Sequence, residues 1–131
     1  MSHLLDVNLL LACGWSSHAR HPEARSWLES QASFTTSPLS ELGFMPVSMS
    51  PAYRASFADA LVALRNITSR SQARVVAADV PVARIPVLTA YADVTDAYHV
   101  ELARAHGLKL ATLDDVLCRK PWAAGIAENP L

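Results

Sequence analysis

The stretch VTDAYHVELARAHGLKLATLDD, residues 94–115, constrains the fold more than any other part of the sequence. Its apolar residues recur at helical spacing and predict a helix that begins near Thr95 and buries two stripes of side chains. Gly107 supplies a helix stop, and the following LKLAT predicts a short strand that ends at Thr112. A helix that leads into a strand after one turn is half of a parallel βαβ unit. The sequence therefore predicts an α/β fold with a mainly parallel sheet.

Acidic residues stand at both ends of this unit and recur after other predicted strands. Asp96 opens the helix, and Asp114 follows the strand. Asp6 lies where the apolar HLLD turns into the helical VNLLLAC, and Glu41 lies near the start of a helix that begins at Ser37-Pro38, after the β-prone SFTT. Because the carboxyl ends of parallel strands share one edge of a sheet, we expect these four acids to converge there.

Convergence of four carboxylates has an electrostatic cost. Two carboxylates about 4 Å apart repel by roughly 4 kcal/mol at an effective dielectric constant of about 20, so the group would not stay ionised unaided. A divalent cation removes this repulsion. An oxygen-only site suits Mg²⁺ or Mn²⁺ better than zinc, which favours nitrogen and sulfur ligands. The candidate metal ligands and catalytic residues are therefore Asp6, Glu41, Asp96 and Asp114.

The remaining segments predict further elements of one domain. Amphipathic helices are expected over residues 22–31 and 56–66, the second with a capping signal at Ser56, and a short buried strand over residues 74–78. His99 and His106, seven residues apart, predict a wetter strip on their helix. We find no repeat and no linker, so residues 1–131 are expected to form a single domain.

Composition excludes some classes of protein and leaves others open. With 51% hydrophobic and 18% charged residues, the chain can bury a core, and its net charge of -1 neither demands nor excludes a polyanionic partner. The two cysteines, Cys13 and Cys118, are far apart and indicate neither a disulfide framework nor a structural zinc site. The N-terminal apolar run is too short to span a bilayer and is interrupted by Asp6. We therefore expect a cytoplasmic protein with no membrane partner.

Three segments of the chain resemble a known family. LLDVNLLLA, the Glu of TSPLSELGF and, above all, VTDAYHVELARAHGLKLATLD resemble the PIN domain, in particular the VapC-type toxins of bacterial toxin–antitoxin pairs. The resemblance runs over almost the whole chain. Its most specific part is TDAY followed by LAxxHG and LATxD.

The resemblance implies a fold, an activity and a set of site residues. The implied fold is a three-layer α/β/α domain, and the implied activity is that of a ribonuclease that is commonly dimeric and inhibited by a cognate antitoxin. The acids that match Asp6, Glu41, Asp96 and Asp114 form the family's metal-binding set, and the Thr that matches Thr112 helps to line the site.

The chain departs from the family pattern after Glu41. Similar toxins often carry a basic residue a few positions later, where this chain has Met45 and Pro46. Pro46 removes a backbone donor and predicts a kink or an end of the helix there. A phosphate contact from that position is therefore not expected, while the predicted metal ligands are unaffected.

Several polar residues have more than one reading. Asp6, Asp96 and Asp114, taken singly, could be helix caps or charges at a helix N-terminus. Asn8 could form a hydrogen bond to a metal-binding carboxylate or to a metal-bound water, or it could form a local hydrogen bond in a turn. Asp115 is an accessory candidate whose plainer role is a helix cap, and the role of Asp93 stays open.

We therefore expect a Mg²⁺- or Mn²⁺-dependent endoribonuclease toxin that cuts RNA, forms a homodimer and binds an antitoxin. Trp15 and Trp122 lie outside the clearest helical stripes and are candidates for those protein contacts. One alternative is a non-catalytic PIN-like subunit that binds RNA or a protein, although clustered acids without a metal do not help a phosphate binder. Another is a phosphotransfer domain that forms an aspartyl phosphate at Asp6, which leaves Glu41 and Asp96 unexplained.

Overall fold

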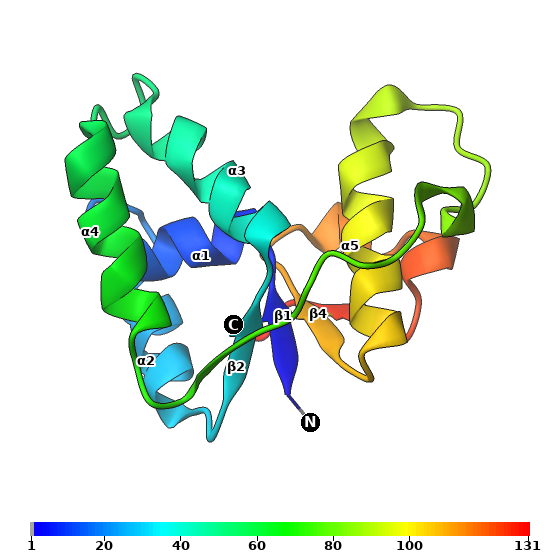
Figure 1. Cartoon of the computed structure of the whole chain (residues 1–131), viewed down its shortest axis with the longest axis horizontal. Helices are drawn as coiled ribbons and strands as arrows, with labels where there is room; N and C mark the ends of the chain where they lie inside the picture. The colour runs from blue at the N-terminus through cyan, green and yellow to red at the C-terminus, as the bar shows by residue number, and fades with distance from the viewer. Residues whose placement is uncertain (1) are drawn as a thin grey trace.

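A five-stranded, all-parallel sheet runs through the middle of the computed structural model, which describes residues 2–131 (Figure 1). The strands are β1 (His3–Leu5), β2 (Phe34–Thr36), β3 (Ala73–Val75), β4 (Lys109–Ala111) and β5 (Ala127–Glu128). Their order across the sheet is β3-β2-β1-β4-β5, so β1 is the central strand, with β2 and β3 on one side of it and β4 and β5 on the other. The predicted mainly parallel sheet is confirmed.

Helices cover both faces of this sheet. They are α1 (Val7–Gly14), α2 (His21–Ser30), α3 (Pro38–Met49), α4 (Phe57–Thr68), α5 (Val94–Ala105) and α6 (Asp115–Cys118), with short 3-10 turns η1 (Val82–Arg84), η2 (Tyr91–Asp93) and η3 (Pro121–Ala123). Figure 1 shows α1 to α4 on one side of the strands and α5 on the other. The three-layer α/β/α prediction is confirmed. No helix within residues 2–131 is both long and apolar enough to cross a lipid bilayer.

The alternation of side chains along β1 and β4 builds one apolar core on each face. Leu5 and Ala111 belong to the core beneath α1, α2, α3 and α4, whereas Leu4 and Leu110 belong to the core beneath α5 and α6. All four side chains are fully buried. A central strand buried on both faces has consecutive apolar residues, as Leu4-Leu5 and Leu110-Ala111 show here.

The turn between α5 and β4 has the conformation that the sequence predicts. Gly107 has a φ of 66°, in the left-handed region that glycine adopts without steric cost. The Leu108 amide then donates to the Ala103 carbonyl at 2.9 Å and closes the end of the helix. This turn returns the chain directly into the centre of the sheet and brings Thr112 to its carboxyl edge.

The predicted buried strand was wrong, and of the kink or end predicted at Pro46 the end was wrong. Residues 74–78 do not form a buried strand, because the observed strand, β3, is an edge strand whose Arg74 and Val75 are exposed. The helix that contains Pro46 does not end there but continues to Met49. Proline removes only its own bond to the carbonyl four residues earlier, that of Leu42, and Leu42 is itself exposed, so water can satisfy the carbonyl.

Candidate active site

Asp6 lies at the carboxyl end of β1 and at the N-cap of α1. Its Oδ1 accepts a hydrogen bond from the Val7 amide at 2.8 Å, and its Oδ2 accepts one from the Thr112 hydroxyl at 2.8 Å. Burial raises the pKa of Asp6, but His99, the Thr112 hydroxyl and the Val7 amide outweigh it and hold that pKa below its ordinary value. Asp6 is therefore a fixed, ionised carboxylate with 6% of its surface exposed.

Thr112 connects Asp6 to the segment that follows β4. Its hydroxyl donates to Asp6 and accepts from the Asn8 side-chain amide and from the Asp114 backbone amide, each at 3.1 Å. The Asn8 Oδ1 in turn accepts from the Leu113 amide at 3.0 Å. A hydroxyl has one hydrogen and two lone pairs, so the bonding capacity of Thr112 is filled. Asn8 thus holds the turn after β4 and reaches Asp6 only through Thr112.

Asp96 faces two other acids from the first turn of α5. Burial, followed by the charges of Asp6 and Asp114, raises the pKa of Asp96 to about 6 from an ordinary value of 3.8. Asp6 and Asp114, which follow β1 and β4, therefore lie close enough to Asp96 for their charges to disfavour its ionisation. The structure brings these three predicted acids together.

Asp114 and Asp115 have different partners. The Asp114 carboxylate accepts from the Leu117 amide at 3.0 Å and caps α6. Asp115 is exposed, and its carboxylate accepts from the Asn129 side chain at 3.1 Å. The prediction of Asp115 as a helix cap was wrong. Asp114, not Asp115, has the extended backbone that a cap requires and occupies the cap position of α6. Asp114 therefore caps α6 and also belongs to the acidic group, by which we mean Asp6, Asp96 and Asp114.

Glu41 lies at the same edge of the sheet but stands apart from the other acids. Its Oε2 accepts from the Thr36 hydroxyl at 3.2 Å, which places it at the carboxyl end of β2, next to β1. The acidic charges that raise the pKa of Asp96 come from Asp6, Asp114 and Asp93. Asp93 stands at the N-cap of α5 and lies 3.7 Å from the Lys120 ammonium.

His99 is the site residue that the sequence pattern did not reveal. It is 1% exposed, so the prediction that it marks a wetter strip of α5 was wrong. Its Nδ1 lies 3.5 Å from Asp6 Oδ1, longer than an ordinary hydrogen bond. His106, by contrast, is half-buried and lies 2.9 Å from the Asp79 carboxylate. The one available signal was spacing, because His99 follows Asp96 by three residues and so shares its face of the helix.

Comparison with known proteins decides the family. The model of the PIN domain family matches residues 3–123, which is most of the chain. The chain belongs to the PIN domain family. This PIN domain is 40% identical to ribonuclease VapC38 of Mycobacterium tuberculosis over 121 residues, which cover 85% of this chain and 84% of the relative. It is 31% identical to ribonuclease VapC39 of the same organism over an aligned length of 144, and the alignment covers 98% of this chain and 99% of the relative.

Solved structures share the fold of this PIN domain. VapC20 of Mycobacterium tuberculosis, described as a sarcin-ricin loop cleaving toxin, superposes with a TM-score of 0.68 at 17% identity and covers 89% of this chain and 92% of that structure. VapBC2 of Rickettsia felis, bound to a promoter DNA fragment, gives a TM-score of 0.59 at 15% identity and covers 98% of both chains. At these identities the likeness concerns the fold.

The chemistry of the acidic group fits a hard divalent cation. Asp6, Asp96 and Asp114 come from different elements, and burial together with the charges of Asp6 and Asp114 raises the pKa of Asp96. A cation would offset the part of this shift that comes from the like charges. Within residues 2–131, no three His, Cys, Asp or Glu side chains stand close enough to close around one ion as they are placed. The side chains would have to turn toward one another to bind it. PIN-domain nucleases of the VapC type are typically metal-dependent.

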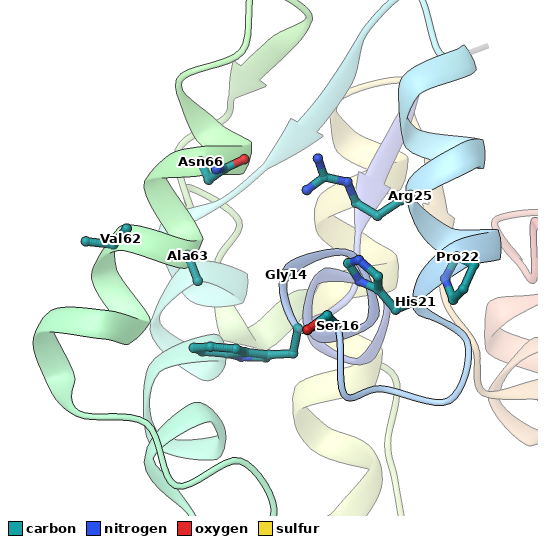
Figure 2. A pocket seen from close by; sticks show the side chains of 9 residues that line it. Gly14, Ser16, His21, Pro22, Arg25, Val62, Ala63 and Asn66 are labelled. Carbon is teal, nitrogen blue, oxygen red and sulfur yellow. The ribbon is translucent and has the colours of Figure 1, made fainter.

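A cavity of about 600 Å³ lies away from these carboxylates, between the end of α1, α2 and α4. Figure 2 shows Arg25 and Asn66 extending into it from α2 and α4. Trp15 and Val62 form part of its wall. None of the candidate metal ligands lines this cavity, so it is separate from the candidate active site of the PIN domain.

Proposed function

We propose that this chain is a ribonuclease toxin of the VapC type that acts in the cytoplasm and hydrolyses RNA at the carboxyl edge of its sheet. The observation that carries the proposal is the placement of Asp6, Asp96 and Asp114 at one edge of the sheet, where burial and then the charges of Asp6 and Asp114 raise the pKa of Asp96 to about 6. Asp6 and Asp114 also cap α1 and α6, but capping does not explain why the half-buried Asp96 faces both of them from α5. Membership of the PIN domain family and the similarity to VapC ribonucleases support the same activity.

The proposed metal ligands are Asp6, Asp96 and Asp114, with Glu41 from the first turn of α3 as a fourth ligand. A bound Mg²⁺ or Mn²⁺ would supply positive charge for the attacked phosphodiester and lower the pKa of a water for in-line attack. Asp6 enters this chemistry already ionised, because its pKa is lowered. Asp96 carries a proton for part of the time near pH 6 and has to release it when a cation binds.

Cleavage of structured RNA with and without Mg²⁺ or Mn²⁺ tests the proposal. We expect cleavage by the wild-type protein with either cation, none in chelator, and a loss of at least about a hundredfold in Asp96→Asn. Asp59→Asn is the matched control, because Asp59 is an exposed acid in the first turn of α4. Binding of RNA without cleavage under every condition would favour the alternative of a non-catalytic RNA-binding subunit.

We also propose that the protein forms a homodimer through an apolar cleft beside the active edge. The cleft has a volume of about 440 Å³. Its lining includes Leu39 of α3, Ile85 from the segment before α5, and Tyr98 of α5. Leu42 on α3 and Tyr91 just before α5 are exposed by 67% and 93%. Exposed apolar residues that flank an apolar cleft indicate a protein contact surface.

The antitoxin is proposed to occupy the cavity that Trp15 lines. Trp15 is only half-exposed, stacks on Phe44 with ring centroids 6.1 Å apart and donates to the Ser48 hydroxyl at 2.9 Å, so it is a fixed wall of the cavity. Val62 lines the same cavity and is 65% exposed. We expect Val62→Asp to weaken binding of the antitoxin in a pull-down. Phe57→Asp, on the same helix but outside the cavity, should bind as the wild type does.

A further inference from the structure

His99 is buried with an unmet bonding requirement. It is 1% exposed on α5, and within residues 2–131 neither its Nδ1 nor its Nε2 has a hydrogen-bond partner. An unpaired buried polar group costs free energy, whereas an aliphatic side chain in the same place would cost none. The neighbours Val100 and Leu102 on the same helix are fully buried and apolar. The presence of an imidazole there calls for a reason other than filling the core.

The contact nearest to this imidazole is with Asp6. Nδ1 lies 3.5 Å from Oδ1, and a shift of about half an ångström would make it an ordinary hydrogen bond. The Val7 amide and the Thr112 hydroxyl already occupy one lone pair on each Asp6 oxygen. A third donor from His99 would fix the rotation of the carboxylate and leave the remaining lone pair of Oδ2 for a cation.

Helix geometry places His99 where it can act on Asp6. Asp96 and His99 are three residues apart on α5 and therefore lie on one face of the helix. Asp96 is half-exposed at the open edge, while His99 lies one turn deeper in the core. On this one helix, Asp96 faces the proposed cation, while His99 approaches Asp6 from the side of the core.

We propose that His99 is a positioning residue, which donates from Nδ1 to Asp6 and holds that carboxylate in the orientation that binds the cation. The contact needs only the Nδ1 hydrogen, which one neutral tautomer of the ring carries and the charged ring carries as well. The inference rests on the proposed function, because it assigns Asp6 a metal-binding task. Groups that orient a metal ligand typically change metal affinity by about 10- to 100-fold when they are removed.

Two substitutions separate the donor from the bulk of the side chain. His99→Leu keeps a buried side chain of similar size without a donor, and His99→Asn retains an amide near the position of Nδ1. His106→Leu is the matched control, because His106 is the C-cap of the same helix but contacts Asp79 rather than Asp6. Mn²⁺ affinity is measured by electron paramagnetic resonance without RNA. We expect His99→Leu to bind Mn²⁺ about tenfold more weakly, and His99→Asn and His106→Leu to stay within about threefold of the wild type.

A double-mutant cycle tests whether His99 acts through Asp6. If it does, His99→Leu lowers the Mn²⁺ affinity of the wild type but has no further effect on Asp6→Asn. Equal losses in His99→Leu and His99→Asn, an unchanged affinity in His99→Leu, or additive losses in the cycle would each overturn the proposal.

A metal-free measurement keeps this inference separate from the proposed function. Imidazole nitrogen resonances, recorded in chelator, should show a hydrogen on Nδ1 of His99 and a change in its shift in Asp6→Asn. A hydrogen on Nε2 alone, or a resonance indifferent to Asp6→Asn, would overturn the positioning role even if His99→Leu failed to fold. Absence of RNA cleavage and Mn²⁺ binding in the wild type would refute the proposed function instead.

Discussion

Thr112 shows how much of the site depends on one small side chain. Its hydroxyl bonds to Asp6, Asn8 and the Asp114 amide in a fully buried position. Thr112→Val keeps the shape and leaves these buried groups without their partner, so we expect the free energy of unfolding to fall by about 1–3 kcal/mol and cleavage to be lost. Denaturant unfolding and an RNA cleavage assay measure the two effects.

Thr112→Ser is the control for this substitution, because it keeps the hydroxyl and loses only a methyl group. It should retain most of the cleavage activity. Equal damage from Ser and Val would mean that packing of the methyl group, rather than the hydroxyl bonds, organises the site.

Asp96 makes the stability of the cation-free protein depend on pH. Its pKa is about 6 in the folded protein and 3.8 ordinarily, so between these values the folded state binds more protons than the unfolded chain. The free energy of unfolding therefore rises as the pH falls through that window. The lowered pKa of Asp6 has the opposite effect: it stabilises the folded protein at pH values above the ordinary pKa of 3.8. This stabilisation is lost as the pH falls below that value.

Thermal melts in chelator at pH 7 and pH 5 check this expectation. Lowering the pH should raise the melting temperature of the wild type by a few degrees more than that of Asp96→Asn, which has no proton to gain. At pH 7, Asp96→Asn should melt above the wild type, while Mg²⁺ should stabilise the wild type more. An identical pH response in both proteins would place Asp96 outside the acidic group.

At the scale of elements, the close approach of α1 and α3 sets the spacing of two acids. A methyl group at Gly43 would lie 2.6 Å from Val7 Cγ2, closer than packed atoms allow. Val7 follows Asp6, and Gly43 follows Glu41 by two residues. Gly43→Ala should therefore push the helices apart, lower the free energy of unfolding by about 1–3 kcal/mol and reduce cleavage.

The second substitution Val7→Ala makes room for the added methyl group. Gly43→Ala with Val7→Ala should regain part of the lost activity, measured by the same RNA cleavage assay. If the double variant is no better than Gly43→Ala alone, the space between the helices does not control the site.

At the scale of the whole molecule, the apolar cleft predicts self-association. Leu42→Asp places a charge beside the cleft, at a residue that is 67% exposed, so it should shift a dimer toward monomer without unfolding the protein. Phe57→Asp alters a residue on α4 that is 57% exposed, and it should leave the dimer intact. Light scattering at tens of micromolar measures both. A monomeric wild type would remove the dimer from the proposed function.

The fold was predictable because its signals are local. The helix, the glycine stop and the strand of residues 94–112 are periodic and short in range. The positions of Asp6 and Asp114 follow from where strands end, and that of Asp96 follows from where the helix begins. The edge position of β3 depends on which strands pair, and no local pattern contains that information. The burial of His99 was missed because a polar residue usually marks a solvated face, whereas here it lies beside Asp6.

The pairing of β1 with β4 joins the two ends of the chain. His3 stands opposite Lys109, and Thr112 bonds to Asp6 across 106 positions of sequence. The Thr112 amide also donates to the Glu128 carbonyl, three residues before the last residue. During translation, Asp6 therefore leaves the ribosome 106 residues before Thr112, the hydroxyl donor that fixes its second oxygen. The nascent chain cannot join Asp6 to Thr112 before the segment that contains β4 has emerged, so the proposed site forms only after the chain between them has been made.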